Sequence, residues 1–360
     1  MRKITGIINI AAAILASLLF IGTAAYGEAS QARPAAAYTE YTERKKVIVC
    51  GNPFGIKMLT EGVVVTDFGA VNGRISQQSP AEAAGVRKGD IITSVNGVTI
   101  NDSAALASAI QRDPVCTIGV IRGGERLTFT ANAIESQSDG EYKLGMWTKD
   151  SVAGIGTMTY YDPETKVFAG LGHGVSDSAT GVRMPLLSGE VTAVTITDIV
   201  RGSAGSPGEL CGAFMSGVEL GKLTLNSDFG IFGECPEPPI LAEPTEVAER
   251  SEVKVGSAVI CTTTGGMMPK EYAIEIVTID RDSTSPAHNM TIRITDDDLL
   301  ARTGGIVQGM SGSPIIQNGR LVGAVTHVLV NDSAMGYAVF ADNMISAYEQ
   351  SSAKSENAFG

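Results

Sequence analysis

Apolar and polar residues alternate over short stretches along most of this chain, and turn residues separate the stretches. Such alternation, together with β-branched side chains, is typical of strands in a half-buried sheet. Beyond residue 136, helical periodicity is confined to residues 296–302 and 342–350. The pattern therefore predicts a mainly β fold class, with antiparallel strands arranged as a sandwich or barrel. The clearest strand segments are residues 191–199, 254–262, 272–279 and 320–330.

A different pattern, with short helices between strands, precedes this region. Ser79 is placed to cap a helix that has Pro80 at its first position and ends at Gly85, because serine and proline favour helix starts and glycine favours helix ends. Asn96-Gly97 indicates a tight hairpin turn. Asp102, or the asparagine before it, can cap a second helix. This region is predicted to be a compact α+β unit.

Residues 79–100 read SPAEAAGVRKGDIITSVNGVTI and resemble the PDZ domains of bacterial proteases. The resemblance implies a PDZ domain over residues 47–135, with a peptide groove between its second strand and the helix at 102–110. A ligand is bound in such a groove by strand addition. A PDZ fold that serves only as a spacer is the alternative. The resemblance places the loop that holds the ligand carboxylate at Phe54, Gly55 and Ile56.

The N-terminus carries an apolar segment behind two cations. Arg2 and Lys3 precede residues 4–26, which contain no charged side chain. This order is typical of an export signal, and the run is also long enough to span a bilayer. We therefore expect residues 1–27 to be a signal peptide or membrane anchor, followed by a linker over residues 28–46. The two cations stay in the cytoplasm, so the remainder is expected outside.

Composition narrows the choice of partners and cofactors. The 360-residue chain has a net charge of −12 and no block of basic residues, which argues against nucleic acid as a partner. Its five cysteines lack C-x-x-C spacing and its three histidines lie far apart, so no metal site is predicted. The phosphate-binding motif G-x-x-x-x-G-K-[ST] does not occur. We expect no cofactor and no metal.

The segment GMSGSP, residues 309–314, is either a simple turn between strands or the site of a nucleophile. Glycines on each side of Ser311 allow backbone N–H groups, those of Gly309 and Ser311, to form an oxyanion hole. A serine needs a base, and His173, flanked by two glycines, offers an accessible imidazole. Together these features favour a serine peptidase. His288 is expected to be exposed and inert. His327 follows the strand at 321–326 and could flank the site, but its strand setting favours a packing role.

The turn around Ser311 resembles the G-D-S-G-G-P nucleophile motif of chymotrypsin-like enzymes, which implies a double β-barrel peptidase domain over residues 136–350. A closer resemblance rests on the apolar N-terminus, the PDZ-like segment, GLGHG and TGGIVQGMSGSPIIQNGRLVGAVTHV. These features are similar to the stage IV sporulation protein B family of signalling serine peptidases. Residues 351–360 are expected to be a polar tail.

That resemblance implies a biological role. Members of the family are exported into the space between the forespore and mother-cell membranes and process themselves near the N-terminus. They cleave a membrane-bound regulator of an intramembrane metalloprotease, which then activates a late mother-cell sigma factor. The expected partners are thus this regulator, other peptide or protein substrates, and a PDZ ligand, either the chain's own N-terminal segment or a partner's tail.

The acidic member of a catalytic triad is the open point. The resemblance assigns it to Asp296, fifteen residues before Ser311, but the same residue is also placed to cap the helix at 296–302. Asp177 and Asp162 are the other acids considered. A second function class also stays open, a non-catalytic PDZ adaptor at the cell envelope whose second domain is a degenerate β scaffold.

Overall fold

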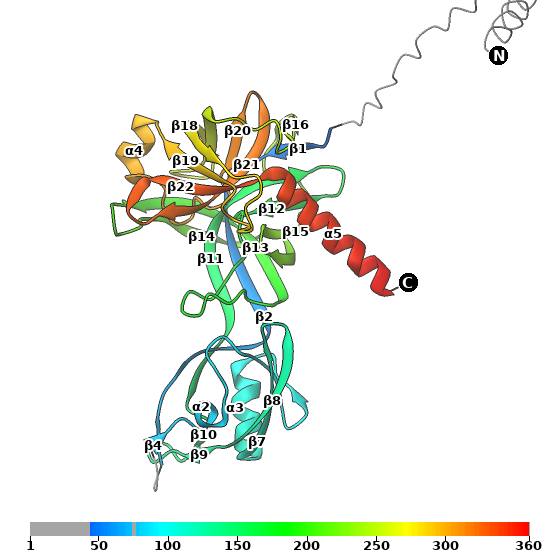
Figure 1. The fold of residues 1–360 in the computed structure, drawn as a ribbon, viewed down its shortest axis with the longest axis vertical. Helices are drawn as coiled ribbons and strands as arrows, with labels where there is room; N and C mark the ends of the chain where they lie inside the picture. The colour runs from blue at the N-terminus through cyan, green and yellow to red at the C-terminus, as the bar shows by residue number, and fades with distance from the viewer. Residues whose placement is uncertain (1–43, 74–76, 360) are drawn as a thin grey trace, which may run out of the picture. The chain divides into compact units, whose positions relative to one another are not determined.

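The computed structural model describes residues 44–73 and 77–359, and these form a mainly β protein (Figure 1). The predicted signal or anchor segment and most of the predicted linker lie outside the described residues. Within the described part, none of the helices is both long enough and apolar enough to cross a membrane.

A first barrel is closed by strands that lie far apart in the sequence. Each strand pairs antiparallel with the next, and the last pairs with the first. Its core includes Phe54, Phe168 and Ile231, all fully buried. In order around the barrel, the strands are β2 (Pro53–Phe68), β11 (Met146–Asp162), β12 (Val167–Gly170), β15 (Gly230–Glu234), β14 (Glu209–Ser227) and β13 (Leu186–Val200).

A second closed barrel follows along the chain. Apolar side chains such as Ile260, Ile292 and Val325 fill it and are fully buried. The predicted double β-barrel is thereby confirmed. The strands, in order around the barrel, are β17 (Gly256–Thr262), β18 (Lys270–Ile279), β19 (Met290–Ile294), β22 (Asp332–Phe340), β21 (Arg320–Leu329) and β20 (Pro314–Gln317).

The PDZ-like segment folds as its turn and cap residues predicted. Ser79 caps α2 (Pro80–Ala84) by accepting a hydrogen bond from the Glu82 amide, and Gly85 ends the helix with φ of 101°. Asp102 caps α3 (Ser103–Arg112). The main strands are β5 (Ile91–Val95), β7 (Val115–Arg122) and β8 (Glu125–Asn132), with shorter ones at β3 (Val71–Asn72), β4 (Gln77–Gln78), β6 (Val98–Thr99), β9 (Ile134–Glu135) and β10 (Tyr142–Lys143).

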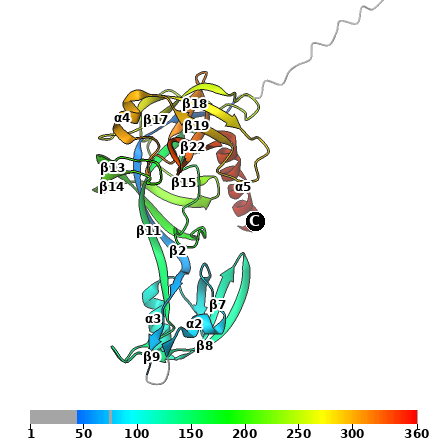
Figure 2. The same cartoon turned by 60° about the vertical axis from the view of Figure 1, so that its left-hand side comes forward.

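Strands β2 and β11 connect the PDZ fold to the first barrel. They run side by side from the Pro53–Thr157 pair to the Phe68–Met146 pair (Figure 2). Only the later part of β2 enters the PDZ sheet, where Val63 and Val64 pair with β5. Strand β1 (Lys46–Val49) pairs with β11 and with β16 (Thr245–Glu246). The first residues of the predicted PDZ domain therefore contribute to the barrel region instead.

The helices outside the PDZ fold differ in how well their ends were predicted. Helix α4 (Asp297–Thr303) matches the expected segment. Helix α5 (Ala341–Phe359) continues through the residues that were expected to form a separate polar tail. The helix expected at residues 342–350 is therefore longer than predicted, because the sequence between Gln350 and Gly360 contains no glycine or proline that would end it.

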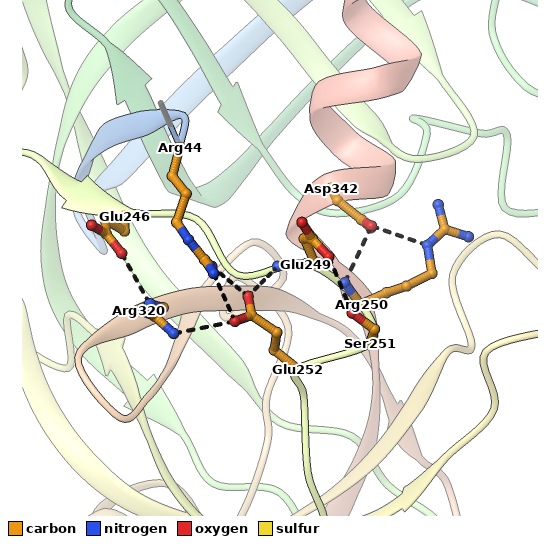
Figure 3. Close-up of polar contacts among 8 residues, drawn as sticks. All are labelled: Arg44, Glu246, Glu249, Arg250, Ser251, Glu252, Arg320 and Asp342. Atoms are coloured by element: carbon orange, nitrogen blue, oxygen red, sulfur yellow. Dashed lines mark hydrogen bonds and ion pairs between the residues drawn. The ribbon is translucent and has the colours of Figure 1, made fainter. Parts of the chain in front are cut away.

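Ion pairs hold the beginning of the described chain against the second barrel (Figure 3). Arg44 donates two hydrogen bonds, of 2.6 and 3.0 Å, to Glu252, and Arg320 contacts both Glu252 and Glu246. The hydrogen bonds from Arg44, followed by one from the Glu249 amide, lower the pKa of Glu252 to about 2. Glu252 is therefore ionised at neutral pH and joins two cations from distant parts of the sequence.

Candidate active site

The turn that carries Ser311 lies between α4 and β20, and its shape depends on glycine. Gly309 and Gly312 have φ of 94° and 93°, in the left-handed region that side chains disfavour. A Cβ at Gly312 would also overlap the carbonyl oxygen of Thr157 in β11. The turn can therefore approach the first barrel only because this position has no side chain.

Two threonines of the first-barrel strand β11 hold this turn in place. The Thr157 amide donates to the Ser311 carbonyl at 2.9 Å, and its hydroxyl donates to the Gly309 carbonyl at 2.7 Å. The Thr159 hydroxyl donates to the Gly312 carbonyl at 2.7 Å. A loop of the second barrel is thus fixed by hydrogen bonds from the first.

These contacts leave two amides of the turn available. The N–H groups of Met310, Gly312 and Ser313 each donate to a backbone carbonyl. Among the described residues, the N–H groups of Gly309 and Ser311 donate to none. They are the two donors that the sequence proposed for the oxyanion hole. A substrate carbonyl whose oxygen becomes negatively charged is stabilised by such preorganised donors.

His173 follows β12 on a sharply turned backbone. Leu171 and Gly172, just before it, have φ of 65° and 67°. The Nδ1 atom of His173 lies 2.9 Å from the carbonyl oxygen of Gly174. A carbonyl only accepts, so Nδ1 carries the proton and Nε2 keeps a lone pair. Burial lowers the pKa of His173 below its usual 6.5, which favours the neutral ring that a general base requires.

Ser311 and His173 line one cavity of about 360 Å³, to which both barrels contribute. The Ser311 hydroxyl donates to the Thr326 carbonyl at 2.7 Å, and within the described residues no hydrogen bond joins it to His173. Catalytic hydrogen bonds are often long or absent without substrate. The structure thus brings the predicted nucleophile and base to the same cavity, with the serine hydroxyl held by a neighbouring carbonyl.

His327 lies at the same cavity, a position that the sequence left open while favouring a packing role. Its ring centroid is 4.5 Å from that of His173 and 5.8 Å from that of His288. Desolvation, and then the neighbouring His173 and His288, lower the pKa of His327 to about 4. His288 is exposed, as expected, and stacks on Tyr337 at 4.0 Å. The available signal in the sequence was that His327 directly follows the strand predicted at 321–326, which comes soon after Ser311.

The three candidate acids lie elsewhere and have other partners. Asp296 caps α4, because its carboxylate accepts from the Leu299 amide at 3.0 Å and from the Ala273 amide at 3.3 Å. Asp177 accepts from Thr180 and pairs with Lys149, and Asp162 pairs with Lys45. Among the described residues, no carboxylate forms a hydrogen bond with His173.

The groove of the PDZ fold is a cavity of about 510 Å³. One side is formed by α3, including Leu106, Ala107 and Ile110, and another by residues 144–148 around the start of β11. The sequence-based placement of the carboxylate loop at Phe54, Gly55 and Ile56 is wrong. These residues belong to the barrel part of β2, where they pair with β11 and β13, and Ile56 instead lines the cavity of Ser311.

In the part of the chain that the structure describes, no three histidine, cysteine or acidic side chains are grouped so that they could hold a metal ion. The cysteines there, Cys50, Cys116, Cys211, Cys235 and Cys261, are free thiols. Burial raises the pKa of Cys50 well above its usual value and that of Cys261 to about 11, so neither is a reactive thiolate at neutral pH.

Two barrels that share a cavity with a serine and a histidine, in a chain that also has a PDZ fold, define a PDZ-containing serine peptidase. Comparison with known families agrees. A family model described as SpoIVB peptidase S55 matches residues 140–345, and a PDZ domain model matches residues 54–132. The chain belongs to the SpoIVB peptidase S55 family.

Individual relatives are more distant. The zinc metalloprotease RasP of Shouchella clausii (strain KSM-K16) is 32% identical over 125 residues, which are 32% of this chain and 29% of that protein. The chain therefore matches less than a third of that relative's length. Among solved structures, the inactive form of the Rv3671c protease has 18% identity and a TM-score of 0.31, with 53% of this chain and 81% of that chain covered. The active form, from M. tuberculosis, has 17% identity and a TM-score of 0.30, with 54% and 72% covered.

Proposed function

We propose that this protein is an exported serine endopeptidase in which Ser311 is the nucleophile and His173 the general base. The observation that carries the proposal is that both side chains line one cavity beside two backbone N–H groups that donate to no carbonyl of the described residues. Ser311 gives up its hydrogen bond to Thr326 and transfers its proton to Nε2 of His173 as it attacks the peptide carbonyl. His173 then protonates the leaving amine, and water releases the acyl group by the reverse sequence.

The amides of Gly309 and Ser311 are the proposed oxyanion donors. The Nδ1 hydrogen bond to Gly174 keeps the correct tautomer of His173, which contacts no carboxylate within the described part of the chain. Removing an oxyanion donor from a serine peptidase lowers kcat by about 10² to 10³, so the glycine turn contributes to catalysis as well as to folding.

The test uses the whole protein, a fluorophosphonate probe and a peptide substrate. Ser311→Ala should abolish both labelling and cleavage. His173→Ala should reduce cleavage by a similar factor, and the double variant should be little worse, since the two residues act as a unit. Ser313→Ala is the matched control, because Ser313 is fully buried and bonded to Met310, and it should still be labelled. Cleavage by purified Ser311→Ala would refute the proposal, and a folded wild-type protein that is never labelled would favour the adaptor function.

The same proposal includes the biological role that the family resemblance implied. The peptidase acts during sporulation, outside the forespore membrane, and cleaves itself and a membrane-associated regulator. This cleavage releases an intramembrane metalloprotease that activates a late mother-cell sigma factor. Membership of the SpoIVB peptidase family supports this assignment. In a spore-forming host, wild-type protein should show a new N-terminus and a cut regulator, whereas Ser311→Ala should show neither. An uncut regulator in the wild type would contradict this role.

A further inference from the structure

Most of the side chains that line the cavity beside Ser311 are apolar. From the first barrel and its loops come Ile56, Val152, Ile155, Leu171 and Val175, and from the second come Ile306, Val307 and Val328. The polar side chains that complete the lining are Gln308, Ser311, Thr326 and the two histidines, His173 and His327. Among the residues that the structure describes, no aspartate, glutamate, lysine or arginine lines this cavity. The described cavity next to the nucleophile is therefore mainly apolar and has no carboxylate, ammonium or guanidinium group that could pair with a charged side chain.

We propose that this cavity is a subsite for an uncharged, apolar side chain that directly flanks the scissile bond of the substrate. The inference rests on the proposed function of Ser311. A charged side chain that enters such a cavity loses its hydration without gaining an ion pair, which is strongly unfavourable. An apolar side chain removes both its own surface and the cavity walls from water, which is favourable. The cavity therefore selects against lysine, arginine, aspartate and glutamate next to the cleaved bond.

Gly154, in β11 of the first barrel, leaves space open in this cavity. It lies in β11 opposite Ile56 and lines the cavity. A Cβ at Gly154 would meet no atom within 4 Å, whereas a Cβ at Gly156, two residues further on, would overlap Leu171. The backbone of Gly154 is not in the left-handed region. Glycine is thus not required there by the backbone or by packing, and its missing side chain leaves cavity space open for a substrate.

The first measurement is the cleavage profile of wild-type protein on a proteome-derived peptide mixture, read by mass spectrometry. The protein must first be labelled at Ser311 by the fluorophosphonate probe. Leucine, isoleucine, valine, methionine or phenylalanine should be enriched at one of the two positions that flank the cut. Enrichment of a charged residue at these positions, or no preference at either, would overturn the subsite. Absence of labelling and of cleavage would instead count against the proposed function itself.

The second measurement fills the cavity. In Gly154→Leu, the ratio of kcat/KM for a leucine-containing substrate to that for its alanine analogue should fall at least tenfold. This expectation follows because one methylene in an apolar pocket changes discrimination by about 10- to 200-fold. Ala153→Leu is the matched control, since Ala153 is the neighbouring residue of β11, is exposed and does not line the cavity. An unchanged ratio in folded Gly154→Leu would show that the substrate side chain binds elsewhere.

Discussion

At the scale of single residues, the proposed base is tuned by burial rather than by a carboxylate. Burial lowers the pKa of His173, and the nearby His327, whose pKa is about 4, is also neutral over the physiological range. Two adjacent imidazoles in one cavity would repel each other if both were protonated. The site therefore keeps His173 neutral, with the Nε2 lone pair available to accept the serine proton.

The pH dependence of cleavage tests this arrangement. Catalysis needs neutral His173, so kcat/KM should fall as the pH drops through the pKa of His173 in the folded protein. Because that pKa is lowered, the fall should be centred below pH 6.5. The measurement is a pH–rate profile on a peptide without titratable groups, with a stability check at each pH. A fall centred above pH 6.5 would mean that a negative charge, such as a carboxylate, reaches His173 in the active enzyme.

At the scale of secondary-structure elements, Asp296 has two candidate roles, capping of α4 and catalysis, which experiments can distinguish. The carboxylate caps the helix and also contacts the Ala273 amide. Asparagine caps a helix about as well as aspartate, whereas alanine costs about 1 kcal/mol. We therefore expect Asp296→Ala to lower the free energy of unfolding by about 1 kcal/mol, and Asp296→Asn to change little in stability or turnover.

Denaturant unfolding and kcat, measured on both variants, distinguish the two roles of Asp296. A folded Asp296→Asn protein with a large loss of kcat would instead assign the residue to the triad, as the family resemblance implied. Such a result would require α4 or its preceding loop to move toward His173 when substrate binds, since no contact joins them in this structure.

At the scale of the whole molecule, the PDZ groove and the peptidase cavity are separate sites in one chain. We predict that a peptide held in the groove, either the chain's N-terminal segment or a partner's tail, times cleavage. Ala107→Trp places a bulky ring on the groove face of α3. Because a tethered peptide binds at high effective concentration, blocking the groove should change the rate of self-processing or of partner cleavage by several-fold. Labelling of Ser311 by the fluorophosphonate probe should stay intact.

The control for the groove is Ala104→Trp on the same helix, at an exposed position outside the groove lining. It should behave as wild type in time courses of processing followed by gel and mass spectrometry. Identical time courses for Ala107→Trp and wild type would leave the PDZ fold as a spacer only.

The sequence by itself determined those features that depend on neighbouring residues. The cap at Ser79 and the glycine end of α2 are set by local hydrogen bonding, and the left-handed backbone at Gly309 and Gly312 needs the freedom of glycine, so short motifs predicted them. Alternating β-branched strands likewise predicted a mainly β fold, since side-chain periodicity reports which faces are buried.

Only the tertiary structure decided which distant segments meet. The Phe54–Ile56 segment was assigned to the PDZ domain by its place in the chain, yet its strand pairs within the first barrel. His327 meets His173 across 154 positions of sequence because His173 follows β12 of the first barrel and His327 lies in β21 of the second. Which strand another strand pairs with depends on surfaces that distant residues form together. The alternation of apolar and polar residues within a strand is the same whichever partner it has. For that reason, the contents of the cavity around Ser311 could not be read from the local pattern.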